Sequence, residues 1–146
     1  MRNIYHAVKN LSGHIFFEES FDWKSLEKVF PLIFDEIAEK GKQTQEELQH
    51  DQVRLELNMR EIRQGKKPLG YNSENSRLKL IFPIGRKEMI ILRNYPSEDI
   101  GEITDKIAKI LKAKKIKFKS DLDKTVLSEI ISPSHHLIPM YSTLFF

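Results

Sequence analysis

The strongest folding signal in this chain is a run of apolar residues at helical spacing between positions 100 and 111. Ile100, Ile103, Ile107 and Leu111 recur every three or four residues, so a helix built from this segment has one continuous apolar face. The segment 115–119 that follows alternates lysine with apolar residues, which is typical of a half-buried strand. The chain is therefore predicted to combine helices with strands.

Alternation, helical spacing, and cap or turn residues predict the other elements. They are strands over 3–8, 14–18, 77–83 and 88–93, a helix from Asp22 to Gly41 that Pro31 interrupts, a helix from Thr44 to Gln64 that opens with a capping box, and a last helix that opens at Ser120. Ser97 is the predicted N-cap of the helix over 100–111. The order ββ-αα-ββ-α-β-α-tail predicts an α+β fold with about four helices and a small antiparallel or mixed sheet.

Length and composition predict a single domain over residues 1–146, with a flexible loop over about 66–76 and an apolar C-terminal tail over 134–146. The chain has no cysteine, which excludes disulfides, thiolate catalysis and cysteine-based metal sites. No apolar run is long enough to span a bilayer, and the first residues lack the layout of a signal peptide. We therefore expect a cytoplasmic protein without membrane contact, and the richness in Ile, Lys and Glu is typical of thermophile proteins.

Positive charge is concentrated late in the chain. Residues 106–120 hold seven lysines and no acidic residue. On the predicted helix and strand, these lysines would form one basic surface that contacts the phosphates of DNA or RNA. The alternative is a solvated helix face and a guarded sheet edge without a binding role. The candidate nucleic-acid-binding residues are Lys106, Lys109, Lys112, Lys114, Lys115, Lys117 and Lys119.

A second hypothesis is that the chain is an assembly subunit, either a homo-oligomer or bound to a protein partner. The helix predicted over 44–64 has a narrow apolar seam on a heavily charged surface, which suits pairing with another helix of this chain or of a second one. The tail is too apolar to remain in solvent, so we expect it to dock. The candidate interaction residues are Leu48, Leu55, Met59, Ile62, Leu144, Phe145 and Phe146.

Motifs for catalysis and cofactors are missing from the sequence. It contains no P-loop, no dinucleotide-binding glycine pattern and no nucleophile elbow. Adjacent His135 and His136 would point to opposite faces of a strand, and the pair His50–Asp51 has no distant partners to complete a metal site. We expect no cofactor and no metal. A non-catalytic role is favoured, although the sequence leaves an enzyme open.

The order of several motifs resembles the non-catalytic, DNA-binding part of large serine recombinases. The segment 37–39 and the charged helix behind it lead into the joint "GKKPLGY" over 65–71, as the long helix of that family leads into its DNA-binding domain. Two later stretches, 102–111 and 125–130, are similar to helices of that domain. The resemblance implies DNA binding but no recombinase activity, because it does not extend to the catalytic serine.

Overall fold

The computed structural model describes residues 10–38, 43–73, 76–95 and 98–122. Within them, four strands form one antiparallel sheet in the order β2-β3-β1-β4. The strands are β1 (Ser12–Phe17), β2 (Leu78–Ile81), β3 (Glu88–Arg93) and β4 (Phe118–Leu122). Three α-helices and one short 3₁₀ helix accompany them: η1 (Trp23–Leu26), α2 (Phe30–Ala38), α3 (Gln45–Arg63) and α4 (Ile100–Ala113). The α+β class is confirmed, whereas the predicted helix count and element order are only partly matched.

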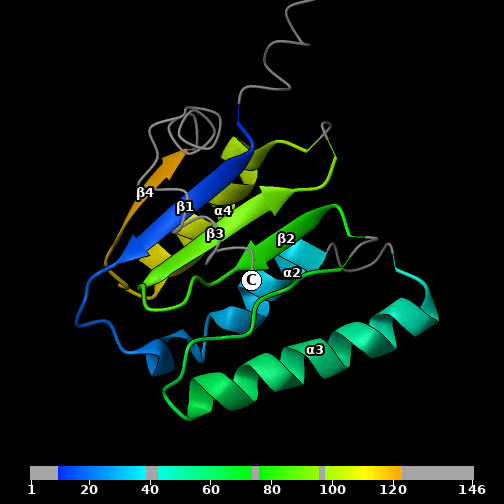
Figure 1. The fold of residues 1–146 in the computed structure, drawn as a ribbon, viewed down its shortest axis with the longest axis horizontal. Coiled ribbons are helices and arrows are strands. Elements are labelled where there is room, and N and C mark those ends of the chain that lie inside the picture. The colour runs from blue at the N-terminus through cyan, green and yellow to red at the C-terminus, as the bar shows by residue number, and fades with distance from the viewer. Residues whose placement is uncertain (1–9, 39–42, 74–75, 96–97, 123–146) are drawn as a thin grey trace, which may run out of the picture.

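Helices α2 and α4 cover one face of the sheet, and α3 lies outside them (Figure 1). Gly13 shows how closely α4 approaches, because a Cβ atom there would lie 1.9 Å from Thr104 Oγ1. Ile15 and Phe17 share this face with Gly13 by the alternation of the strand, and both belong to the hydrophobic core. The isoleucine stripe of α4 is buried there as predicted, with Ile107 and Leu111 completely inaccessible.

Pro31 and the cap residues determine where the helices begin. The chain forms a 3₁₀ turn capped by Asp22, and α2 begins at Phe30. Pro31 therefore lies in the first turn of α2, where its missing N–H has no helical partner to lose. The division of the first predicted helix at Pro31 is confirmed. So is the capping box of α3, in which Thr44 accepts from the Glu47 N–H and Glu47 accepts from the Thr44 N–H.

Two predicted boundaries are wrong. The N-cap of α4 is Asp99, whose side chain accepts from the Glu102 N–H, and not Ser97. Ser120, Asp121 and Leu122 do not open a helix, because they continue β4 in register with β1. Ladder hydrogen bonds to a neighbouring strand outweigh the local capping preference of serine and aspartate. The predicted strand over 3–8, the helix beyond residue 122 and the tail lie outside the described residues.

Candidate functional site

The segment that joins α3 to β2 is fastened to the helix by a buried asparagine. Asn58 accepts from the Gly70 N–H at 2.8 Å and donates to the Gly70 carbonyl at 3.0 Å and to the Arg54 carbonyl at 2.8 Å. Gly70 adopts φ +93, and a Cβ atom there would lie 2.3 Å from the Leu80 carbonyl oxygen. Only glycine fits this position. The "GKKPLGY" joint thus has a backbone role here.

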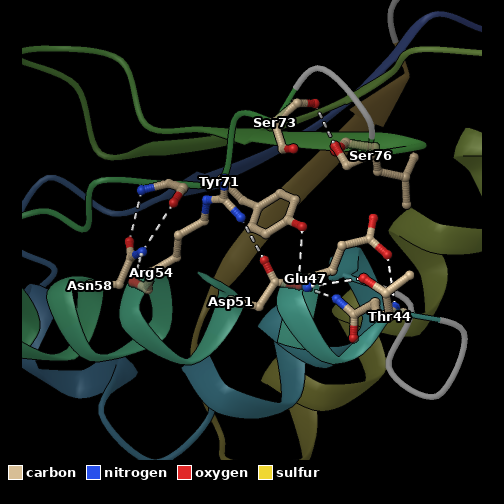
Figure 2. Close-up of polar contacts among 11 residues, drawn as sticks. Thr44, Glu47, Asp51, Arg54, Asn58, Tyr71, Ser73 and Ser76 are labelled. Atoms are coloured by element: carbon tan, nitrogen blue, oxygen red, sulfur yellow. Dashed lines mark hydrogen bonds and ion pairs between the residues drawn. The ribbon is translucent and has the colours of Figure 1, made fainter. Parts of the chain in front are cut away.

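Next to this anchor, the Asp51 carboxylate is the centre of a polar network with the side chains of Arg54, Tyr71 and Gln43 (Figure 2). Asp51 accepts from Arg54 Nη1 at 2.9 Å and from the Tyr71 hydroxyl at 3.2 Å. The Arg54 guanidinium also lies 5.5 Å from the centre of the Tyr71 ring, a cation–π contact. Burial, together with the hydrogen bond to Asp51, raises the pKa of Tyr71 to about 12. The phenol therefore remains a hydrogen-bond donor at neutral pH.

A polar cavity of about 220 Å³ opens beside this network. It lies between the end of α2, the first half of α3 and the segment that leads into β2. Figure 2 shows Ser73 and Ser76 on one side and Asp51, Tyr71 and Glu47 on the other. We call it the α3 cavity, and its lining residues are Ile37, Ala38, Gln43, Glu47, His50, Asp51, Arg54, Tyr71, Ser73, Ser76 and Arg77.

The seven predicted lysines are all exposed, but they do not share one face. Lys106, Lys109 and Lys112 lie on the outer side of α4, opposite its buried stripe. Lys119 pairs with Phe16 in the sheet register, so its side chain leaves the sheet on the face that α4 does not cover. Lys114, Lys115 and Lys117 connect the two groups around the edge of the sheet. We call all seven residues the lysine surface.

Lys115 occupies an unusual position in this set. It has φ +60, the one positive φ of a non-glycine residue in the described part of the chain. The Lys115 N–H donates to the Lys112 carbonyl and the Ile116 N–H donates to the Leu111 carbonyl, which is the hydrogen-bond pattern of a helix end that normally carries glycine. The fold therefore accepts a strained lysine here.

On the face of the sheet opposite α4, a second polar network is buried. The Ser12 hydroxyl lies 2.8 Å from His14 Nε2, and His14 Nδ1 lies 2.7 Å from a carboxylate oxygen of Glu88. Arg86 lies 3.0 Å from the other oxygen of Glu88. This is the hydrogen-bond order of a catalytic triad, but Ser12 is only 1% exposed. A substrate has no direct approach to it, so the network is structural in this conformation.

Three of the four predicted interaction residues of α3 pack within this chain, and the fourth, Leu48, is half-buried. Met59 and Ile62 are buried in the core of this chain, and Leu55 packs against that core. The apolar seam thus serves intramolecular packing, and its assignment as an intermolecular surface needs correction. The outer side of α3 instead exposes Val53 and Leu57 at 59% and 38%. Leu144, Phe145 and Phe146 lie outside the described residues.

Metal binding finds no support among the side chains that the structure describes. No group of three histidine, cysteine, aspartate or glutamate residues could hold an ion within that part of the chain. Asp51 turns inward to Tyr71, whereas its neighbour His50 is exposed on α3. His135 and His136 lie outside the described residues.

No family model, no curated protein and no solved structure matches this chain. The resemblance to large serine recombinases therefore stays a prediction. Among the described residues, no helix is both long and apolar enough to cross a membrane.

Proposed function

We propose that the protein binds nucleic acid through the phosphate backbone, using the lysine surface. The observation that carries the proposal is the lack of neutralising partners. Of the seven lysines, only Lys106 has an ion pair in the described part of the chain, with Glu102 at 3.6 Å. Within the described part of the chain, the other six ammonium groups have no ion pair that would compete with a polyanion.

The strain at Lys115 supports the same function. A left-handed backbone costs a non-glycine residue about 1–2 kcal/mol, and glycine would avoid that cost. Strained residues concentrate where function requires a particular side chain. An ammonium group at the turn between α4 and β4 would connect the helix lysines with the strand lysines. We therefore infer that the strained backbone is kept because binding requires a positive charge at this position.

Binding of this kind is electrostatic and depends little on base sequence. Each phosphate that a lysine neutralises releases condensed counterions, so affinity falls as salt rises. Aromatic side chains for base stacking are scarce on this surface, because Phe118 faces the core beneath α4 and packs against it. We therefore expect DNA and RNA to be bound with little sequence preference.

The direct test is fluorescence anisotropy of labelled single-stranded and duplex oligonucleotides at about 50 mM salt. The wild-type chain should bind, and a triple variant with Lys106, Lys109 and Lys112 changed to Gln should bind several-fold more weakly. A matched control changes Lys24, Lys28 and Lys66 to Gln, because these lysines are exposed but lie elsewhere. Absence of binding by the wild type, or equal weakening in both variants, would contradict the proposal.

A second candidate function is self-association through the outer side of α3. Exposed Val53 and Leu57 lie one turn apart, with Glu46 near the start of the helix and Arg60 near its end. If two copies pair antiparallel, the acidic end of one helix meets the basic end of the other, and the apolar residues meet in the middle. Light scattering should then show a concentration-dependent dimer.

Charge reversal distinguishes this pairing from unspecific association. Glu46→Arg and Arg60→Glu should each weaken the dimer, because each places like charges together. The double variant should restore it, since the opposite charges again meet. A monomer at all concentrations, or a double variant weaker than either single one, would rule out this pairing.

A further inference from the structure

Strand β4 leaves one edge of the sheet open. It is the last strand in the order β2-β3-β1-β4, so only β1 pairs with it in the described part of the chain. The Phe17 N–H donates to the Lys87 carbonyl on the β3 side, and N–H groups along a strand alternate between its two neighbours. The odd-numbered residues of β1 thus bond to β3 and the even-numbered ones to β4. Because Ser120 is the register partner of Ile15, its own N–H and carbonyl point to the open edge.

Two observations agree with an open edge at these residues. The Leu122 N–H, which points outward by the same alternation, donates to the Asp121 side chain at 2.8 Å. Within the described part of the chain, Ser120 makes no hydrogen bond outside the pairing with β1, and Lys119, Ser120 and Asp121 are all exposed. An exposed strand edge is a template on which a further strand can pair.

The sequence of this edge is complementary to itself. Around Ser120 it reads Lys-Phe-Lys-Ser-Asp-Leu-Asp, with basic residues before the serine and acidic residues after it. If two copies pair antiparallel with Ser120 opposite Ser120, Lys119 of each copy lies opposite Asp121 of the other. Outward-pointing hydrogen bonds allow the register to shift only by two residues, and such a shift would place Lys119 against Lys119 or Asp121 against Asp121. Charge therefore selects one register.

Strand geometry supports the contacts of this register. Residues opposite each other in an antiparallel pair have their side chains on the same face of the sheet. Ser120 would exchange both hydrogen bonds with its copy, which makes Lys119 and Asp121 a non-hydrogen-bonded pair, the kind whose side chains lie closer together. Phe118 would lie opposite Leu122 of the second copy. Both pack against the core beneath α4, so the apolar layer would continue across the interface.

We propose that the protein forms a symmetric dimer by pairing the outer edges of β4, in the register that places Ser120 opposite Ser120. The partner is a second copy of this chain, because both the charges and the apolar residues of the edge match its own sequence. The two sheets would become one, with both α4 helices on the same face. Pairing would occupy Lys119, whereas Lys106, Lys109 and Lys112 lie on the outer side of α4. The interface differs from the one on α3 and requires no nucleic acid.

Analytical ultracentrifugation of two charge variants tests the register. The wild-type chain should dimerise with a dissociation constant of about 0.1 mM or tighter. Lys119→Asp would set acidic residues against each other across the interface, and Asp121→Lys would set basic residues against each other, so each variant should dimerise at least about tenfold more weakly. An equimolar mixture of the two variants should recover the dimer, because every acidic residue then faces a basic one.

Amide hydrogen exchange then identifies the edge that pairs. In the wild-type dimer the Ser120 amide should exchange at least about tenfold more slowly than in either β4 variant alone. Glu46→Arg is the matched control, because it reverses a charge on α3 and should leave the protection of Ser120 unchanged. A wild-type chain that stays monomeric, a mixture of the two variants that does not dimerise, or a dimer in which Ser120 exchanges as fast as in the variants would overturn the proposal.

Discussion

Replacing Lys115 by glycine should make the protein more stable and a weaker nucleic-acid binder. Lys115 has φ +60, which costs an L-residue about 1–2 kcal/mol. Glycine adopts this conformation without strain, but its greater freedom in the unfolded chain costs about 0.4–1 kcal/mol. The difference predicts a gain of about 0.5–1 kcal/mol in the free energy of unfolding.

Urea denaturation followed by circular dichroism measures this gain as a higher midpoint at unchanged slope. The melting temperature should rise by about 1–4 °C. Lys114→Gly is the matched control, because Lys114 has φ −102 and glycine there brings only the entropic loss of about 0.5–1 kcal/mol. Both variants remove one positive charge, so charge effects on stability cancel in the comparison.

The same two variants then separate stability from binding. Each should reduce affinity for a single-stranded oligonucleotide several-fold, although one is stabilised and the other destabilised. If Lys115→Gly lowers stability, the account of backbone strain is refuted. If it raises stability without changing affinity at low salt, the strain has no connection with binding.

Three further substitutions test the fold and its polar networks. Asn58→Ala should lower the free energy of unfolding by about 2–4 kcal/mol, because it leaves the buried Gly70 N–H and carbonyl without partners, whereas exposed Arg60→Ala should change it by no more than about 0.5 kcal/mol in urea titrations. Gly13→Ala should destabilise by at least about 1–3 kcal/mol, since its Cβ would lie 1.9 Å from Thr104 Oγ1, and Thr104→Ala in the same chain should partly restore the melting temperature. Because the pKa of Tyr71 is raised to about 12 from about 10 in the unfolded chain, its stabilising contribution is complete below pH 10 and is lost between about pH 10 and 12. Tyr71→Phe should remove that part of the alkaline loss, and an identical alkaline profile would contradict the assigned pKa.

The sequence predicted those features of the fold that depend on residues close together in the chain. The isoleucine stripe of α4 and the capping box of α3 depend on residues three or four positions apart, and both were confirmed. The strands predicted over 77–83 and 88–93 are also present, as β2 and β3. The predicted end of β4 was wrong. Pairing with β1, which is more than a hundred residues away in the chain, determines where β4 ends.

The polar sites needed information that sequence alone does not contain. Glu88 looks like an ordinary surface residue, yet it is buried against His14, 74 positions away. The α3 cavity likewise forms because Asn58 fastens Gly70 to the helix and brings Tyr71 to Asp51. The "GKKPLGY" segment resembles a joint between domains, and its glycine and tyrosine are the signals in the sequence that indicate this contact. The lysines were visible in the sequence, but their division between two faces follows only from the sheet register.

The dependence of nucleic-acid affinity on salt tests the central claim most directly. For single strands, each neutralised phosphate contributes about −0.7 to the slope of log K against log salt, so engagement of the lysine surface predicts a slope between about −2 and −4. Changing Lys106, Lys109 and Lys112 to Gln should make the slope shallower by about 2, and changing Lys24, Lys28 and Lys66 should leave it unaltered. A slope near zero, or one that responds equally to both triple variants, would contradict binding through the lysine surface.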